Sequence, residues 1–555
     1  MTRNSRRCCP NHRRQRTRVV AVVLALVLVA AACGGGGDDG AGGGSGTTAV
    51  SGEPVNGGKV VYGLEAESSN GLCLAEAQLA ISGIQVARAI YDTLTIPNAD
   101  GEYVPYLAKS VTPNATFDRW TIELRDGVKF HDGSDLTAEV VKNNLDAYRG
   151  QYPARKPLLF IFVYDNIDTV EAKGPLTVVV KTKTPWPAFP AFLFMNGRFG
   201  VMAQAQLDSP DHCADKLIGT GPFELVEWRV NDHLTVAKNP DYWQVGLPHL
   251  DEIEFRPIPE AGQRVNALQS GEIDALHTAN ALSISELRDL ADAGDIAVNE
   301  APEYAEVGYE LLNANVPPFD NVNARLAFAH AIDRDTLNEV RNKGILTNAS
   351  GPFAPGSMGY LEDAGYPSYD VAKAREYVAK YEAETGEKLS FTYTTTPVPE
   401  SIDWATMLQQ MVEAVGGSMQ INAEDQSQLI SDAIANNFQA AGLRLHPGGD
   451  PDLQYIWWHG GSPVNFGKFS DPEIDRLLDE GRAESDPVKR EVIYQDLNKR
   501  FATQAYDLWY QWTLWTVATA TDVHGVFGAD LPDGSKPFPG LADGHSLTGL
   551  WIGGQ

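Results

Sequence analysis

The chain has 555 residues, of which 43% are hydrophobic and 9% aromatic, a composition typical of a folded protein too long for a single core. Its formal net charge is −29. So acidic a chain lacks the lysine and arginine surface that nucleic acid or an anionic lipid surface requires, and we expect neither as a direct partner.

The first 32 residues have the pattern of an export signal. Seven arginines and no acidic residue precede an apolar run of 14 residues, 19–32, which is shorter than the roughly 20 that span a bilayer. Cys33 follows directly, as in a bacterial lipoprotein signal, which this segment resembles and in which the cysteine thiol receives a lipid. Ala30 occupies a position where Leu or Val is usual, so an ordinary secretory signal is the alternative.

The remaining cysteines and the glycines extend this prediction. Cys8 and Cys9 lie within the signal, so lipidation of Cys33 leaves Cys73 and Cys213. Two cysteines in an oxidising compartment are expected to form one disulfide, with two buried thiols as the alternative. Residues 33–57 are glycine-rich and almost without apolar side chains, which predicts a flexible tether.

Strand signals dominate the next part of the chain. Residues 58–62 are rich in β-forming side chains, and Trp120, Ile122 and Leu124 alternate with polar residues, as in a half-buried strand. The turn at 126–127 predicts that 128–130 returns as the second strand of a hairpin. Thr137 has the position of a helix N-cap.

Further along the chain, strands give way to helices. Residues 223–227 and 234–236 predict another hairpin, and helical patterns follow at 321–342, 370–383, 403–415, 472–483 and 486–505. The mixture predicts an α/β or α+β protein with several sheets.

Motifs for catalysis are missing. The sequence contains no GxSxG, HExxH, CxxC, P-loop or EF-hand pattern, and no two histidines have an i, i+4 metal spacing. We therefore assign no catalytic residue, metal ligand or cofactor and expect a protein that is not an enzyme. His131 is predicted to be a turn residue. His446 and His459 flank an aromatic segment and are better candidates for ligand contact, with a structural role as the alternative.

Several blocks, taken in order, resemble the family 5 extracellular solute-binding proteins of ABC importers, which include oligopeptide-, dipeptide- and nickel-binding proteins. The blocks extend over residues 58–527, so the resemblance covers nearly the whole chain after the signal. They are 104–110 (VPYLAKS), 124–133 (LRDGVKFHDG), 136–141 (LTAEVV), 219–223 (GTGPF), 239–243 (NPDYW), 268–274 (LQSGEID), 317–320 (PPFD), 331–334 (AIDR) and 469–475 (FSDPEID).

The resemblance implies a two-lobed α/β fold of the type II periplasmic-binding-protein class, with a third domain added to the first lobe. The implied boundaries are 58–95, 217–313 and 522–555 for lobe I, 96–216 for the extra domain and 314–521 for lobe II. A ligand would bind in the cleft between the lobes, and hinge closure would bury it.

One segment departs from the peptide-binding members. Peptide-binding members have a segment that resembles W-x-x-D-Y-x-D-P, whose first aspartate holds the ligand's α-amino group. The matching segment here is 444–451 (RLHPGGDP), and Pro447 occupies the position of that aspartate. Asp452 substitutes for that aspartate only if the loop shifts. A strictly peptide ligand is therefore in doubt.

Aromatic residues surround this segment: Tyr455, Trp457, Trp458, Phe466 and Phe469, with a second cluster of Trp509, Tyr510, Trp512 and Trp515. They suit sugar rings, flat apolar ligands or cations, and core packing is the alternative. Trp457 and Trp458 are expected to point in different directions along a strand. The predicted ligand-binding residues are Arg444, His446, Asp450, Trp457, Trp458, His459 and Asn465.

The sequence thus predicts a monomeric, lipid-anchored receptor on the extracytoplasmic face of the cell membrane. It would capture a small solute, peptide-like or other, and deliver it to the permease and ATPase subunits of an ABC transporter. A ligand-sensing receptor on the same fold remains an alternative. A secreted hydrolase is a weaker one, because no nucleophile motif is present.

Overall fold

The computed structural model describes residues 52–67, 71–77, 79–157, 160–210, 213, 216–301, 306–446 and 448–553. The predicted signal, Cys33, Pro447 and most of the predicted tether lie outside these residues. Residues 52–57 have no regular structure, and the N–H of Gly57 donates to the carbonyl of His249 (2.8 Å). Within the described ranges, every helix is too short or too polar to cross a bilayer.

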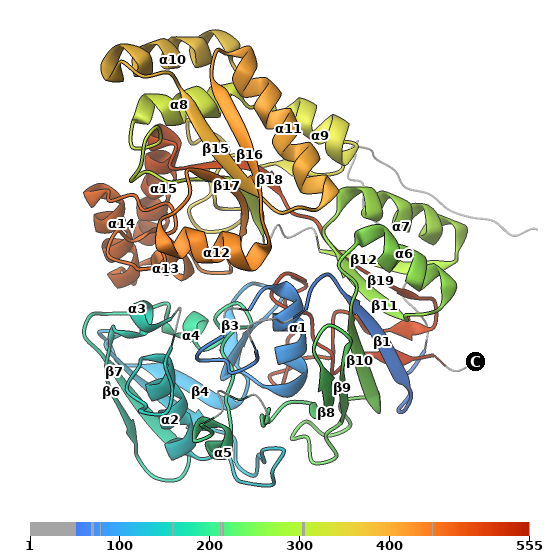
Figure 1. Ribbon diagram of the computed structural model, residues 1–555. Helices are drawn as coiled ribbons and strands as arrows, with labels where there is room; N and C mark the ends of the chain where they lie inside the picture. The colour runs from blue at the N-terminus through green and yellow to red at the C-terminus, as the bar shows by residue number, and fades with distance from the viewer. Residues whose placement is uncertain are drawn as a thin grey trace, which may run out of the picture. The chain divides into compact units, whose positions relative to one another are not determined.

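A mixed seven-stranded sheet organises the first lobe (Figure 1). Its strands, in spatial order, are β12 (Ile296–Ala301), β19 (Trp515–Ala520), β11 (Ala275–Thr278), β1 (Lys59–Leu64), β10 (Glu252–Pro257), β9 (His233–Lys238) and β8 (Phe223–Arg229). β1 is parallel to both β10 and β11, and β8 and β9 form the predicted antiparallel hairpin.

Alternation along β1 places helices on both faces of this sheet. Val61 packs with α6 (Ala261–Ser270) and α7 (Ala281–Ala293) around Leu268, Leu276 and Leu287. Its neighbours Val60 and Tyr62 belong to the larger core that contains α1 (Ile81–Ile90). After the last strand of the sheet, β20 (Val523–His524) pairs antiparallel with β21 (Trp551–Ile552) near the end of the chain.

The extra domain contains an antiparallel sheet in the order β4-β5-β7-β6. These strands are β4 (Ala108–Pro113), β5 (Arg119–Leu124), β7 (Thr177–Thr182) and β6 (Ile167–Ala172). The remaining elements of this domain are β2 (Thr95–Pro97), β3 (Tyr103–Pro105), α2 (Ala138–Tyr148), α3 (Ile161–Tyr164), α4 (Phe189–Phe192) and α5 (Gln204–Leu207).

The second lobe is built on a six-stranded sheet (Figure 1). Its strands, in spatial order, are β14 (Thr347–Asn348), β18 (Asp507–Trp512), β13 (Val307–Leu312), β17 (Ala440–Leu445), β15 (Ser390–Thr395) and β16 (Ser418–Ala423). Its helices are α8 (Val322–Ala331), α9 (Arg334–Asn342), α10 (Val371–Thr385), α11 (Pro399–Ala414), α12 (Gln426–Ala435), η1 (Pro451–Gln454), α13 (Tyr455–Trp458), α14 (Pro472–Ala483) and α15 (Pro487–Gln504).

Sheet membership corrects two of the predicted domain boundaries. β13 belongs to the six-stranded sheet although 307–312 were assigned to lobe I. β19 belongs to the seven-stranded sheet although 515–520 were assigned to lobe II. The seven-stranded sheet is therefore left after Ala301 and the six-stranded sheet is reached at Val307, and the chain returns between Trp512 and Trp515, earlier than predicted at both places.

Predictions that depend only on residues close together in the sequence are confirmed in β5 and at the start of α2. Trp120, Ile122 and Leu124 are buried along β5, and the Thr137 hydroxyl caps α2 by accepting from the Val140 N–H (3.4 Å). The hairpin predicted for 128–130 is wrong. β5 pairs with β4 and β7 instead, and Lys129 makes only an isolated bridge to Asp135.

The helical patterns differ from the structure mainly at one place. The pattern at 321–342 corresponds to two helices, α8 and α9, because the backbone leaves the helical conformation at Ile332 and Asp333. Asp333 caps the second helix by accepting from the Thr336 N–H (3.0 Å). The other four patterns are confirmed as α10, α11, α14 and α15.

Two features fasten the extra domain to the first lobe. Cys73 and Cys213 form the predicted disulfide, and the buried Arg155 lies beside it, with Nη1 3.2 Å from the Cys73 sulfur. The glycines of 219–222 lie against the end of α1, where a Cβ at Gly219 would be 2.0 Å from the carbonyl oxygen of Ile90. His131 bonds this turn through both ring nitrogens, which gives it the structural role predicted for it.

Candidate functional site

The two segments that connect the lobes meet at Glu306. This residue precedes β13 and is 1% exposed. Its carbonyl oxygen accepts from the N–H of Thr513 (2.9 Å) on the other connection. Its carboxylate accepts from Trp515 Nε1 (2.9 Å) and lies 2.8 Å from His446 Nε2. The two connections are therefore held together by a backbone hydrogen bond and by the Glu306 side chain. His446, in the loop after β17, contacts the same carboxylate.

Arg444 extends this cluster to the first lobe. Its guanidinium lies 3.5 Å from the Glu306 carboxylate and 3.1 Å from that of Glu65, which follows β1. It also lies over the Trp515 ring, 5.4 Å from the centroid. The Arg444 side chain remains 41% exposed, so it can contact a solute as well as its two carboxylates.

The side chains around Glu306 determine the charge of its carboxylate. Burial alone would raise the pKa of Glu306, but the Arg444 guanidinium and His446 lower that pKa to about 2. Glu306 is therefore ionised at neutral pH. A buried carboxylate that retains its charge binds the cations beside it firmly, which holds Arg444 in place.

The loop after β17 and the two short helices that follow it contact residues of the 96–216 region. Four pairs of residues make these contacts: Asn196 Nδ2 with the His446 carbonyl (3.3 Å), the Gly449 N–H with Tyr103 Oη (3.2 Å), Trp186 Nε1 with Asp452 Oδ2 (2.7 Å), and the rings of Phe162 and Tyr455 (5.8 Å between centroids). His446, Gly449, Asp452 and Tyr455 thus belong to the surface of lobe II that meets this region.

The structure separates the predicted site residues into two groups. Arg444 and His446 come together around Glu306. Asp450 does not join them. It caps η1 by accepting from the Asp452 N–H (2.9 Å) and forms a two-pronged ion pair with Arg490, with N–O distances of 2.6 and 2.7 Å.

The aromatic candidates are mostly packed into lobe II. Trp457 and Trp458 lie in the short helix α13, so the strand expected for them is wrong. Trp458 is 2% exposed and packs against the rings of Phe353, Phe501 and Trp509, which leaves no face for a ligand. Trp457 is half-buried against Phe466.

The last two predicted residues also have protein partners. His459 stacks on Tyr455 with centroids 4.8 Å apart, and Asn465 is buried and donates to the Phe469 carbonyl (3.0 Å).

In the second aromatic cluster predicted from sequence, Trp509, Trp512 and Trp515 are buried in one core. Tyr510 instead packs at a tilt against Trp404 (4.6 Å between centroids), and the Trp515 Nε1 donates to Glu306.

Asp452 does not replace the amino-binding aspartate of peptide-binding relatives. It is fully buried, accepts from Arg482 Nε (2.9 Å) and from Trp186 Nε1, and so has partners on both oxygens. The position held by Pro447 lies outside the described residues.

Sequence reasoning missed two buried glutamates. Nothing in the local sequence distinguishes Glu306, because its importance comes from its place at the lobe connection. Glu310 had a usable signal, since it is a charged residue in β13, all of whose six residues are buried. Its carboxylate accepts from Tyr393 Oη (2.6 Å) and Trp404 Nε1 (2.8 Å), and burial raises its pKa to about 7.

Comparison with known proteins agrees with this architecture. Residues 102–466 match the model of the middle region of the bacterial extracellular solute-binding proteins, family 5. The chain is 29% identical to the glutathione-binding protein GsiB of Pectobacterium atrosepticum, over 76% of this chain and 82% of that protein. It is 28% identical to GsiB of Escherichia coli K12, over 74% and 80%.

Solved structures resemble the whole described fold. The PBP AgaA of A. tumefaciens R10, in complex with agropinic acid, is 26% identical with a TM-score of 0.79, covering 90% of this chain and 99% of that one. The oligopeptide-binding protein AppA of Bacillus subtilis, in complex with a nonapeptide, is 21% identical with a TM-score of 0.79, covering 90% and 100%. The two sheets joined at Glu306, together with these matches, show that the chain belongs to the family 5 bacterial extracellular solute-binding proteins.

Proposed function

We propose that this protein is a lipid-anchored receptor that captures a small organic solute, peptide-like or other, between its lobes and delivers it to an ABC permease. The observation that carries the proposal is Arg444. It is held by Glu65 of one lobe and by Glu306 at the lobe connection, yet 41% of its side chain is exposed. A solute carboxylate bound by Arg444 would lie where the lobes are joined, so a solute that also contacts the first lobe would favour their closed arrangement.

The ligand is identified by releasing bound molecules from freshly purified, denatured protein and analysing them by mass spectrometry. We expect an organic solute with at least one carboxylate. Recovery of no solute, together with no thermal shift from glutathione or a panel of short peptides, would contradict the receptor proposal.

Arg444 is tested with Arg444→Gln, which retains hydrogen-bonding capacity but removes the charge. We expect the Kd for the recovered solute to rise at least tenfold, as loss of a charge-assisted hydrogen bond implies. Arg229→Gln is the matched control, because Arg229 is an exposed arginine that forms an ion pair with Glu227 on the same strand. Equal affinities in wild type and Arg444→Gln would remove Arg444 from the site.

The anchor is tested separately with Cys33→Ala. If Cys33 carries the lipid, wild type should fractionate with membranes and the variant should be released. A variant that remains membrane-bound would show that Cys33 is not the anchor.

A further inference from the structure

Tyr510 lies at a bulge in β18, the strand that leads back to the first lobe. Gly308 of β13 pairs with Gln511, but the next residue of β13, Tyr309, pairs with Trp509, so Tyr510 is the extra residue of β18. A bulge of this kind changes the direction of a side chain. The other five residues of β18 are buried, whereas Tyr510 is only half-buried.

A glycine on the neighbouring strand makes room for the Tyr510 ring. A Cβ at Gly308 would lie 2.5 Å from Tyr510 Cε2 and 2.7 Å from Tyr510 Oη, so the ring lies directly against Gly308. Trp404 of α11 packs against the same ring. Gly308 and Trp404 together therefore fix the direction in which the Tyr510 hydroxyl points.

This direction brings the hydroxyl to the Arg444 side of the sheet. Arg444 in β17 is the antiparallel partner of Gly308. Directly opposite residues of such a pair point to the same face, with Cβ atoms about 4.5–5.5 Å apart. Because Tyr510 Oη lies so close to the position of a Gly308 Cβ, the hydroxyl and the Arg444 side chain share one face, within reach of one small group.

The Tyr510 hydroxyl is a donor without an acceptor among the described residues. The carboxylates of Glu306 and Glu310 are near enough to influence its pKa, but both accept from other side chains. Burial raises the pKa of Tyr510, so the hydroxyl keeps its proton at neutral pH. A partly buried donor of this kind is normally satisfied by water or by a ligand.

We propose that Tyr510 is a specificity-determining residue, whose hydroxyl donates to the same solute carboxylate that the Arg444 guanidinium binds. The two donors would come from β18 and β17, the strands on either side of β13. The inference rests on the proposed function and deepens it, because it narrows the anchoring group of the solute to a carboxylate that accepts from two donors at once.

Two donors select a carboxylate over a carboxamide. Both oxygens of a carboxylate accept, whereas a carboxamide presents its N–H groups to one of the two donors. That donor would then remain unpaired in a partly buried site, which costs affinity. The fully amidated form of a solute should therefore bind much more weakly than the solute itself.

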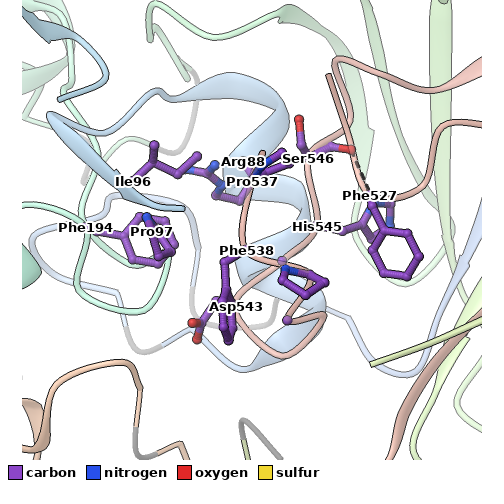
Figure 2. A pocket seen from close by; sticks show the side chains of 13 residues that line it. Arg88, Ile96, Pro97, Phe194, Phe527, Pro537, Phe538, Asp543, His545 and Ser546 are labelled. Carbon is purple, nitrogen blue, oxygen red and sulfur yellow. Dashed lines mark hydrogen bonds between the residues drawn. The ribbon is translucent and has the colours of Figure 1, made fainter. Parts of the chain in front are cut away.

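The hollow lined by Arg88, Ile96 and Phe194 offers a solute no comparable place (Figure 2). Its free volume of about 30 Å³ holds water rather than a solute. Arg88 is half-buried, with its guanidinium 5.3 Å from the Phe194 centroid. Arg444, by contrast, has an exposed side chain on the face that it shares with Tyr510.

The test is calorimetric titration of the purified protein with S-methylglutathione and with alanylalanine. Both carry free carboxylates, and neither has a thiol that could attack the disulfide. We expect at least one probe to bind, Tyr510→Phe to raise its Kd at least fivefold, and full amidation of the probe to raise the Kd for wild type at least tenfold. Tyr369→Phe, at an exposed tyrosine on the loop before α10, is the matched control and should leave the Kd unchanged.

Equal Kd values for wild type and Tyr510→Phe would overturn the inference, as would failure of both probes to bind at millimolar concentration. The proposed function is decided separately by the solutes released from the purified protein. A released solute whose affinity depends on Arg444 but not on Tyr510 would refute the role of Tyr510 and leave the receptor standing.

Stability distinguishes this role from a structural one. Because the Tyr510 hydroxyl bonds no described group, Tyr510→Phe should leave the urea midpoint unchanged or raise it. A lower midpoint with an unchanged Kd would make Tyr510 a structural residue only.

Gly308→Ala is a second variant, which keeps the hydroxyl but displaces the ring, and should also raise the Kd at least fivefold. Gly481→Ala is its matched control, because a Cβ there would lie 2.7 Å from the Tyr494 ring, away from Arg444. The control should lower the urea midpoint without changing the Kd. If Gly308→Ala fails to fold, Tyr510→Phe alone decides.

Discussion

Buried carboxylates are the side chains that most distinguish this protein at the scale of single residues. Burial raises the pKa of Asp452 in spite of Arg482, and that of Glu310 in spite of hydrogen bonds from a tyrosine and a tryptophan, whereas for Glu306 the Arg444 guanidinium outweighs burial and lowers the pKa. Asp507, at the start of β18, is 2% exposed and its Oδ1 has no hydrogen-bond partner within the described ranges. These environments have opposite effects on pKa, because cations favour the ionised form and burial disfavours it.

Asp507 should make stability fall as pH rises. Burial raises its pKa from 3.8 to about 8, and the nearest titratable groups, Tyr309 and Tyr366, supply no positive charge. Between pH 3.8 and about pH 8 the folded protein keeps a proton on Asp507 that the unfolded chain has lost. Each rise of one pH unit in this range therefore lowers the free energy of unfolding by up to about 1.4 kcal/mol. Asp507→Asn should reduce the slope in urea unfolding between pH 5 and pH 8, with Glu310 contributing to what remains, and Asp100→Asn, at an exposed position, should retain it in full.

Glu306→Gln should destabilise the fold by about 3 kcal/mol, because it leaves His446 and Arg444 beside a neutral buried amide. Its folded pKa of about 2 lies below the usual value, so its contribution is present above about pH 4.5 and is lost as the pH falls toward 2. Urea unfolding at pH 7 measures the effect, with the exposed Glu227→Gln as control. A loss no greater than in the control would show that the cluster is not stabilising.

At the scale of elements, the turn 219–222 is determined by contact with α1. Gly219→Ala would place a Cβ 2.0 Å from the Ile90 carbonyl oxygen, a backbone atom that cannot move without shifting the helix. We expect a loss of at least about 3 kcal/mol of stability. Gly262→Ala is the control, because its Cβ would meet only the flexible Glu260 carboxylate at 3.3 Å. The control should be neutral or stabilised by about 0.5 kcal/mol.

Strands and helices that depend on neighbouring residues could be predicted from the sequence, whereas the strands with which they pair could not. The alternation in β5 and the Thr137 cap depend on residues within a few positions, and both predictions are confirmed. The hairpin at 128–130 is wrong because a turn signal does not reveal that β7, more than 40 residues later, is the neighbour of β5. The lobe boundaries were displaced for the same reason, since sheet membership is a long-range property.

The candidate site was predictable in part. Arg444 and His446 were predicted because they lie in the segment that matches the cleft-lining segment of peptide-binding relatives, and their contact with a solute stays a prediction. Trp458 was misassigned because an aromatic residue near such a segment has the same pattern whether it faces a cleft or the core, and here it packs on Phe501.

At the scale of the whole molecule, the disulfide between Cys73 and Cys213 closes a loop of 140 residues. In the chain-entropy model such a crosslink is worth about 5 kcal/mol, because it restricts the unfolded chain. The Cys73→Ser/Cys213→Ser variant should therefore unfold at markedly lower temperature, and reductant should lower the melting temperature of wild type but not of the variant. A wild-type protein with two free thiols would contradict the crosslink.

The hydrogen bond between the Thr513 N–H and the Glu306 carbonyl has a consequence for the evolution and engineering of this fold. It means that lobe II, although it occupies the middle of the chain, enters and leaves at one point. Such a segment has the geometry of a domain insertion, with its two ends side by side. Residues 306–513 could therefore be excised and joined end to end, or exchanged for the same segment of a relative, with the seven-stranded sheet left uninterrupted.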